Sequence, residues 1–306
     1  MTVEIIPFDQ GQALLDWIKL TDALQAGHTL AKADIGDSFL YRDPDTMLLR
    51  SAWIDGLGLA VKTATIFPEN GKLDKPTING GVCLYSDRDG TLEALVDFHL
   101  VTKWKTAGDS LLAARKLARK DSKRIVIVGA GTVAHSLREA YGTLFPDAVF
   151  SVWNRSPAAA EKLAAKYSRV TVATDLETAV MSGDIVACAT MSKEPLIKGE
   201  WLNPGQHIDL IGAFRPDMRE VDNLALQRAR VFVDSRETTI HHIGELKIPL
   251  ASGAITEQAI LADYYDLASG KFARKSDDDI TIFKNGGGAH LDLMTSRYIL
   301  DAWRNR

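Results

Sequence analysis

The chain has 306 residues, which is too long for one ordinary compact domain and about right for two. Hydrophobic residues make up 46% and charged residues 25%, and the formal net charge is −4 with acids and bases interspersed. This balance allows a substantial core and gives no electrostatic footprint for nucleic acid or an anionic membrane. No stretch approaches the roughly 18 uninterrupted apolar residues of a membrane span, and the first residues do not resemble a signal peptide.

Cys83 and Cys188 are the only cysteines, and they fall in separate predicted domains. A disulfide framework or structural zinc site is therefore not expected, and this usage predicts a reducing, cytoplasmic environment. The adjacent His241 and His242 would not share a helix face, and Asp277–Asp279 lacks the spacing of a calcium loop. We therefore predict no metal site.

The first hundred residues predict an α+β region with mostly antiparallel strands. Val3–Pro7 is a short strand, and Asp9 is a candidate N-cap for a helix running to about Gln25. Later strands are separated by turn signals and cover Ser38–Tyr41, Thr46–Trp53, Leu57–Phe67, Val82–Ser86 and Thr91–Val96. The last two predict a hairpin, and a helix from about Leu100 to Lys120 follows.

The second region alternates short apolar strands with helices, which predicts a parallel sheet covered on both faces. Its predicted strands are Arg124–Val128, Val149–Trp153, Val170–Val172, Ile185–Ala189, His207–Ile211, Val231–Val233 and Ile280–Phe283. We therefore predict an α/β protein with a Rossmann-type domain over residues 119–288. A discontinuous α+β domain would span residues 1–118 and be completed by the helix 289–306.

A glycine-rich loop follows the strand at 124–128 and opens a helix. Gly129-Ala-Gly131-Thr132-Val133-Ala134 matches the pattern G-x-G-x-x-A. The first glycine allows a tight turn, the second lets backbone approach a pyrophosphate, and the alanine allows close helix packing. The helix N-terminus, with Thr132 and Val133, then offers N–H groups to the phosphates. This context predicts a bound nicotinamide dinucleotide.

The next strand ends in Asn154-Arg155-Ser156, which bears on the choice of cofactor. An acidic residue here would bind the adenosine ribose and indicate NAD(H). Asn154 removes that charge, Arg155 offers donors to a 2′-phosphate, and Ser156 adds a hydroxyl. We therefore favour NADP(H); if Arg155 is only a solvated loop charge, NAD(H) remains the alternative.

Three further residues lie near the carboxyl ends of predicted strands, where such sheets bind ligands. Thr190 and Met191 are expected to line the cofactor pocket. Asp234 either contacts the cofactor or caps the following helix. Cys188 is expected to be a small buried hydrophobe rather than a nucleophile, since no histidine base lies near it in the sequence.

Three cations of the first region are candidates for a substrate site. Lys62 lies within an apolar strand, Arg42 sits beside Asp43-Pro44, and Lys105 lies in the helical segment Thr102–Ala107. From the pattern alone, a lysine within a strand is usually on its solvated face.

At these residues the chain resembles the ornithine cyclodeaminase/μ-crystallin family. The matching segments follow in order along nearly the whole chain: Lys62 with Phe67–Gly71, Ala94–Asp97, Leu100–Ala107, the glycine loop, Val152–Arg155, Ile211–Glu220, Val231–Asp234, Pro249–Gly253 and Thr281–Lys284. The resemblance implies a homodimer formed through sheets of the first domain and a small imino-acid or amino-acid substrate whose carboxylate binds basic residues there.

The resemblance also assigns roles to the cations. Arg42 resembles the family's first carboxylate-binding arginine, with Arg50 as the alternative, and Lys62 resembles its active-site lysine. Lys105 stands where the family usually has arginine, so it keeps the charge but loses the bidentate fork. His290, just after three glycines, is a weaker candidate for substrate contact.

Two departures from the family pattern bear on activity. Related cyclodeaminases carry an aspartate where this chain has Phe214, which cannot titrate, and Lys284–Gly288 differs from the usual Lys-Ser-Val-Gly. The sequence therefore favours an NAD(P)H-dependent reductase of a small cyclic imino acid, such as Δ1-pyrroline-2-carboxylate, or of a related amino or keto acid. The alternatives are an ornithine cyclodeaminase and a non-catalytic NADPH-dependent small-ligand-binding protein.

Overall fold

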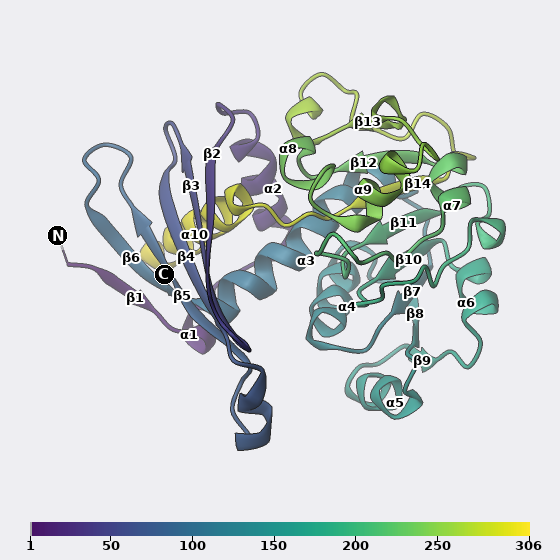
Figure 1. Cartoon of the computed structure of the whole chain (residues 1–306), viewed down its shortest axis with the longest axis horizontal. Helices are drawn as coiled ribbons and strands as arrows, with labels where there is room; N and C mark the ends of the chain where they lie inside the picture. Colours follow the sequence, from purple (N-terminus) through teal and green to yellow (C-terminus); the bar gives the residue numbers. More distant parts are fainter. Residues whose placement is uncertain (1) are drawn as a thin grey trace. The chain divides into compact units, whose positions relative to one another are not determined.

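The computed structural model describes residues 2–306, and the chain divides into two compact units (Figure 1). Unit 1 comprises Met1–Lys105 and Gly287–Arg306, and unit 2 comprises Thr106–Gly286. The predicted α/β class, with a parallel Rossmann-type sheet in one part of the chain, is confirmed.

Unit 1 is built on a six-stranded sheet in the order β1-β6-β5-β4-β3-β2. Its strands are β1 (Glu4–Ile6), β2 (Asp34–Arg42), β3 (Asp45–Ile54), β4 (Gly58–Ile66), β5 (Ile78–Tyr85) and β6 (Leu92–Asp97). All neighbours are antiparallel except β1 and β6, which run parallel. A 3₁₀ turn over Pro68–Leu73 separates β4 from β5.

The helix predicted to start at Asp9 is two helices, α1 (Phe8–Gln12) and α2 (Trp17–Gly27), so that prediction was wrong. The N-cap of α2 is Asp16, whose carboxylate accepts a hydrogen bond from the backbone N–H of Lys19 at 2.9 Å. The backbone of Asp16 is extended, so a helix that begins at Asp9 cannot continue through this residue. Helix α2 begins directly after it.

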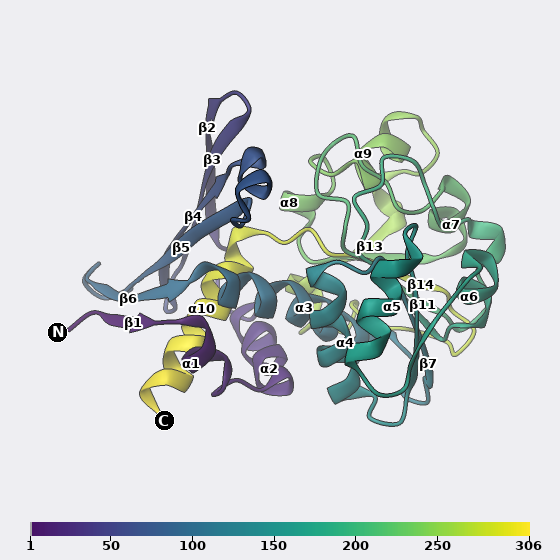
Figure 2. The same ribbon diagram turned by 90° about the horizontal axis from the view of Figure 1, so that it is seen from below.

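The C-terminal helix α10 (Ala289–Arg304) returns to unit 1 as predicted and lies against β3 and β4. It also runs beside α2 (Figure 2). A Cβ atom on Gly27 would lie 2.6 Å from the Met294 sulfur, so glycine is what allows the two helices to approach this closely. Because α10 is covered on both sides, even its polar residues His290 and Asp292 are buried.

Unit 2 is built on an eight-stranded, entirely parallel sheet in the order β13-β12-β14-β11-β10-β7-β8-β9. Its strands are β7 (Arg124–Val128), β8 (Val149–Trp153), β9 (Val170–Val172), β10 (Ile185–Cys188), β11 (His207–Leu210), β12 (Arg230–Val233), β13 (Ile260–Ala262) and β14 (Thr281–Lys284). Of these strands, β13 alone was not predicted; it has three residues and lies at the sheet edge.

The helices of unit 2 follow the strands in α/β alternation. They are α4 (Thr132–Leu144), α5 (Pro157–Lys166), α6 (Leu176–Ser182), α7 (Asn223–Arg228), α8 (Arg236–Thr239) and α9 (Gly244–Ala251). A continuous core of mostly branched aliphatic side chains joins β7, β10, β11 and β12 to α6, α7 and α9. Burial of this apolar surface is the main force that holds the unit together.

Helix α3 (Phe98–Leu117) contributes to both units, which part after Lys105 rather than near residue 118 as the sequence suggested. Its second half is tied to unit 2 by polar contacts. The Tyr264 hydroxyl donates to the Asp109 carbonyl, and the Asn285 amide donates to the Thr106 carbonyl.

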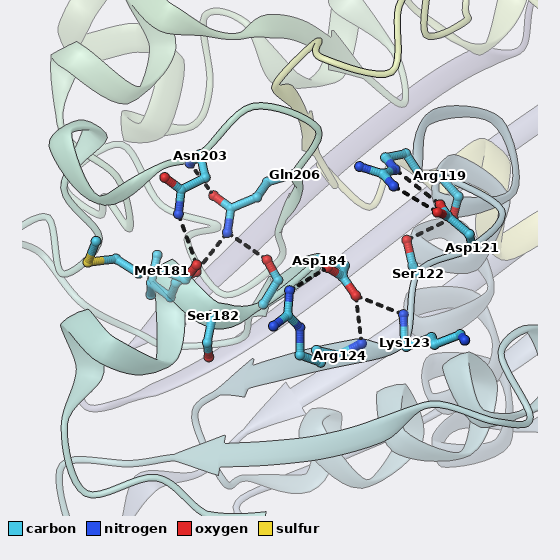
Figure 3. A network of polar contacts seen from close by, with 12 residues as sticks. Arg119, Asp121, Ser122, Lys123, Arg124, Met181, Ser182, Asp184, Asn203 and Gln206 are labelled. Carbon is cyan, nitrogen blue, oxygen red and sulfur yellow. Dashed lines mark hydrogen bonds and ion pairs between the residues drawn. The ribbon is translucent and has the colours of Figure 1, made fainter.

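The amino ends of β7, β10 and β11 are fixed by a polar network, shown in Figure 3. The Asp184 carboxylate accepts from the backbone N–H groups of Lys123 and Arg124 at 2.8 and 2.9 Å. The buried Gln206 amide donates to the carbonyls of Val180 and Gly183. These bonds satisfy backbone groups at one edge of the sheet, while the opposite, carboxyl edge carries the glycine loop.

Neither Cys83 nor Cys188 forms a disulfide. No helix within residues 2–306 has the length and apolar character needed to cross a membrane. In the same residues, no group of three or more histidine, cysteine, aspartate or glutamate side chains is arranged to hold a metal ion.

Candidate active site

In unit 1, the register of three strands places charged residues in one row. Asp37 of β2 pairs with Arg50 of β3, and Arg50 pairs with Lys62 of β4. Residues directly opposite each other in a sheet share a face. The next residue of this row is Val82, which is buried. Lys62 therefore lies on the covered face of the sheet and not on a solvated one.

Arg42 does not join this row. It lies five residues from Asp37 along β2, and because side chains alternate, it points to the other face. Its side chain is 78% exposed, pairs with Asp45 at 2.7 Å and lies over the Phe67 ring. The structure thus brings together Lys62 and Arg50, the alternative arginine of the sequence analysis.

The Lys62 ammonium is held by two side chains of unit 1. Nζ donates to Asp292 Oδ1 and to Thr102 Oγ1, each at 2.9 Å, and lies 4.8 Å from the centre of the Phe98 ring. Burial lowers the pKa of Lys62 to about 8, although Asp292 acts to raise it. That value includes charge repulsion from Lys105 and Arg50, which also acts to lower the pKa.

Arg50 and Lys105 converge on one backbone carbonyl. The Gly287 oxygen accepts from Arg50 Nη1 at 2.9 Å and from Lys105 Nζ at 3.1 Å. Gly287 has φ of 67°, a conformation that glycine adopts without strain. The other edge of the Arg50 guanidinium donates to both carboxylate oxygens of Asp37 at 3.0–3.2 Å. Three cations from β3, β4 and α3 therefore surround the start of α10.

Two residues of α10 complete the cluster. The buried Asp292 keeps a low pKa: burial acts to raise it, but Lys62, Lys105 and Arg50 together lower it. Burial, reinforced by Lys105, lowers the pKa of His290 to about 3, so its imidazole is neutral near pH 7. His290 packs edge-on against His28, with ring centres 5.3 Å apart.

In unit 2, the glycine loop has the features of a phosphate cradle. Gly129 has φ of 109°, and a Cβ there would lie 2.7 Å from the Ala189 carbonyl oxygen. A Cβ on Gly131 would meet no atom within 4 Å, so the space beside the start of α4 is open. The first-turn N–H groups there, including those of Thr132 and Val133, have no acceptor within the helix. These residues fit a dinucleotide pyrophosphate.

Asn154 braces this loop from the end of β8. Its Oδ1 accepts from the Ala130 N–H at 3.2 Å, and its Nδ2 donates to the Ser156 carbonyl at 2.9 Å. A carboxylate could make the first bond and not the second, since it has no donor. Arg155 and Ser156 are exposed beside this brace.

At the ends of β10 and β11, two loops share a carboxylate that the sequence analysis did not single out. Glu220 is buried, and its Oε1 accepts from both the N–H and the hydroxyl of Thr190. Its Oε2 accepts from the N–H groups of Gly212 and Ala213 at 2.8 and 3.2 Å. Glu220 thus fixes Thr190, whereas Met191 beside it is exposed.

Asp234 is buried, and its Oδ1 accepts from the Ser235 N–H and the Thr239 hydroxyl. It therefore holds the turn between β12 and α8; the N-cap of α8 is Ser235, and a contact of Asp234 with the cofactor stays a prediction. Cys188 is also buried, and burial raises the pKa of its thiol well above the usual range, as expected of a small buried hydrophobe.

Comparison with known proteins agrees with these features. The model of the ornithine cyclodeaminase/mu-crystallin family matches residues 51–306. The chain belongs to this family. It is 49% identical to a Delta(1)-pyrroline-2-carboxylate reductase of Paracoccus denitrificans over 302 residues, 97% of this chain and 96% of the relative.

Two solved structures of similar proteins cover nearly the whole fold. The Delta(1)-pyrroline-2-carboxylate reductase of Thermococcus litoralis, in complex with NADH and L-proline, superposes with a TM-score of 0.90 at 25% identity, covering 99% of this chain and 98% of that one. An archaeal alanine dehydrogenase dimer with bound NAD superposes with a TM-score of 0.90 at 25% identity, covering 100% of this chain and 97% of that one. The resemblance seen in the sequence is thus confirmed.

The structure explains one departure from the family pattern. Where the family usually has valine, this chain has Gly286, whose Cβ would overlap the Thr239 hydroxyl and lie 2.8 Å from Asp234 Oδ1. The Asp234–Thr239 bond thus occupies the space that valine would need. Phe214, in place of the cyclodeaminase aspartate, is exposed and has no group that can exchange a proton near pH 7.

Proposed function

We propose that this protein is an NAD(P)H-dependent reductase of small cyclic imino acids, with Δ1-pyrroline-2-carboxylate as the first candidate substrate. The observation that carries the proposal is the convergence of Arg50 and Lys105 on one acceptor beside the buried Lys62. Such a cluster suits a carboxylate and a neighbouring basic nitrogen. The names of the relatives supply the specific imino acid.

In this proposal, each cation has a separate task. Arg50 and Lys105 bind the substrate carboxylate, and Lys62 delivers a proton to the imine nitrogen. A bound NAD(P)H supplies the hydride that reaches the imine carbon. The C=N double bond becomes single as one N–H and one C–H bond form, and NAD(P)⁺ is released. A pKa near 8 leaves most of the Lys62 amine protonated at neutral pH and ready to donate.

We also propose that the enzyme prefers NADPH to NADH and uses both. The support is the turn at Asn154, whose amide takes part in the loop and carries no charge against a 2′-phosphate. The exposed Arg155 beside it can pair with that phosphate. Ratios of kcat/KM for the two cofactors, measured with one imino acid, test the preference directly.

The test of the main proposal is cofactor oxidation followed at 340 nm with defined substrates. We expect turnover with Δ1-pyrroline-2-carboxylate and with its six-membered homologue, and formation of proline from the former. Pyruvate plus ammonia tests the amino-acid dehydrogenase alternative. Absence of cofactor oxidation with all three, together with tight NADPH binding, would instead support the non-catalytic binding protein.

A second candidate function is ornithine cyclodeamination. It requires a group that handles the amine during ammonia loss and ring closure, and Phe214 is unsuited to that task. Incubation with ornithine and NAD⁺, followed by assay of proline and ammonia, separates the two. Ornithine turnover without imine reduction would overturn our first choice.

We further propose a homodimer formed through the outer face of the unit 1 sheet. On the face opposite Lys62, large apolar side chains of β1, β2, β3 and β6 are exposed, namely Ile5, Leu40, Trp53 and Leu95. Exposed apolar patches of this kind mark protein contacts. Light scattering of the purified protein tests this. A cytoplasmic location, suggested by the two free thiols, is likewise proposed.

A further inference from the structure

Resting on the proposed function, we propose that Asp292 is a positioning residue that holds the Lys62 ammonium in place and keeps it protonated beside two other cations. No part of the sequence pattern marked this acid, since it lies between Leu291 and Leu293 in the C-terminal helix. The inference gives that helix a role in the chemistry as well as in packing.

The geometry of the pair is the first support. Asp292 Oδ1 lies 2.9 Å from Lys62 Nζ, and 8% of the lysine side chain and 2% of the aspartate side chain are exposed. The second oxygen, Oδ2, is buried and makes no hydrogen bond within residues 2–306. Lys62 is thus the hydrogen-bonded cation that compensates this carboxylate, and the two charges depend on each other in a medium that screens them weakly.

The charges around Lys62 are the second support. The charged and titratable groups that face it or its neighbours are Arg50 from β3, Lys105 from α3, His290 and Asp292 from α10, Asp37 from β2 through Arg50, and His28 from α2 through His290. His290 is neutral, and Asp37 is engaged by Arg50. Asp292 is therefore the anion in direct contact with Lys62, and it opposes both burial and the repulsion of two cations.

The sign of the effect follows from this arrangement. With Asp292 present, the pKa of Lys62 is about 8. Without its charge, desolvation and the two cations act unopposed and lower that pKa, so the ammonium is lost at lower pH. A donor that is deprotonated at neutral pH cannot supply the proton for imine reduction.

The experiment is the pH profile of kcat/KM for Δ1-pyrroline-2-carboxylate reduction, because this parameter reports groups of the free enzyme and free substrate. Wild type should lose activity above about pH 8. The basic limb of the profile is the fall in kcat/KM at high pH. In Asp292→Asn this basic limb should move to lower pH by about 1 to 3 units. The substrate's own ionisation is the same in both assays and cannot produce this shift. A basic limb that stays in place would overturn the proposal.

The matched control is Glu93→Gln. Glu93 pairs with Arg297 on the same helix at 2.7 Å, both side chains being largely buried, and it does not touch Lys62. The Glu93→Gln substitution should perturb α10 without moving the basic limb. Asp292→Glu, which keeps the charge but displaces it, should retain the wild-type limb and lower kcat. If Asp292→Asn does not fold, an unchanged kcat in Asp292→Glu would contradict positioning.

A direct titration separates this inference from the proposed function. Lysine labelled with ¹³C at Cε gives one NMR signal per residue, and the Lys62 signal is the one absent from Lys62→Met. Its midpoint should be about 8 in wild type and lower in Asp292→Asn, whether or not any imine is turned over. Equal midpoints would reject the role of Asp292, whereas a shifted midpoint without imine turnover would reject only the substrate.

Discussion

Lys62 and Asp292 lie 230 residues apart in the sequence and meet as a buried ion pair, with Nζ 2.9 Å from Oδ1. The pair joins a central strand of unit 1 to the C-terminal helix. Removing one partner of such a pair leaves the other charge buried and uncompensated, which costs more than removing both. This asymmetry leads to a stability prediction.

We expect Lys62→Met to lower the free energy of unfolding by about 3 to 5 kcal/mol at pH 7, where most of the Lys62 amine is protonated. The double variant Lys62→Met/Asp292→Leu should recover most of that loss, because neither charge of the pair is left buried without the other. In the single variant the loss should shrink as the pH falls, because burial acts to raise the pKa of Asp292 and the Lys62 charge that lowers it is gone. Urea unfolding of wild type, the single variants Lys62→Met and Asp292→Leu, and the double variant measures this, and additive losses would contradict a direct interaction.

The two arginines considered for the carboxylate can be compared directly. Arg50→Ala should raise KM for the imino acid by about tenfold, the difference between a hydrogen bond to a charged acceptor and one to the neutral Gly287 carbonyl. Arg42→Ala should change KM by less than about twofold, because Arg42 is exposed on the opposite face. Steady-state kinetics at fixed NADPH give both values. If Arg42→Ala raised KM more than Arg50→Ala did, Arg42 would be the arginine that binds the carboxylate.

Arg155 is expected to set cofactor preference. Arg155→Ala should raise KM for NADPH by about tenfold or more and leave KM for NADH nearly unchanged, because only NADPH carries the 2′-phosphate. Lys166→Ala, which removes an exposed charge from the end of α5, serves as the control for net charge. Equal effects on both cofactors would show that Arg155 is a solvated loop residue.

The space beside Gly286 gives a packing prediction. Gly286→Ala should destabilise the protein by about 1 to 3 kcal/mol, because the added Cβ overlaps the Thr239 hydroxyl. Gly81→Ala is the control, since a Cβ there would meet no atom within 4 Å. Thermal unfolding compares them. Similar melting temperatures for both variants would mean that the Asp234–Thr239 contact can shift at little cost in free energy.

Much of the fold could be predicted from the sequence because unit 2 follows strong local rules. The bounds of β7, β8 and β9 agree with the predicted strands, since each is a short apolar run between turns. The break between α1 and α2 was missed because both Asp9 and Asp16 are acceptable N-caps, and only backbone geometry decides between them.

The candidate site was predictable only in part. Lys62 and Lys105 came from the family pattern, but the choice between Arg42 and Arg50 depends on the pleat of the sheet and on its register. Asp292 and Glu220 were missed for a different reason. Their partners are a distant lysine and backbone N–H groups, and neither kind of partner leaves a local sequence signal.

The Gly287 carbonyl has a consequence for affinity. Arg50 and Lys105 already have an oxygen to bind, so an arriving carboxylate exchanges one acceptor for another instead of meeting unsatisfied donors. The net gain is then the difference between a charged and a neutral acceptor, which is smaller than the full strength of either bond. Product release benefits equally, because the backbone can take back both donors as the amino acid leaves. In the proposed site, this exchange of acceptors favours product release over tight substrate binding.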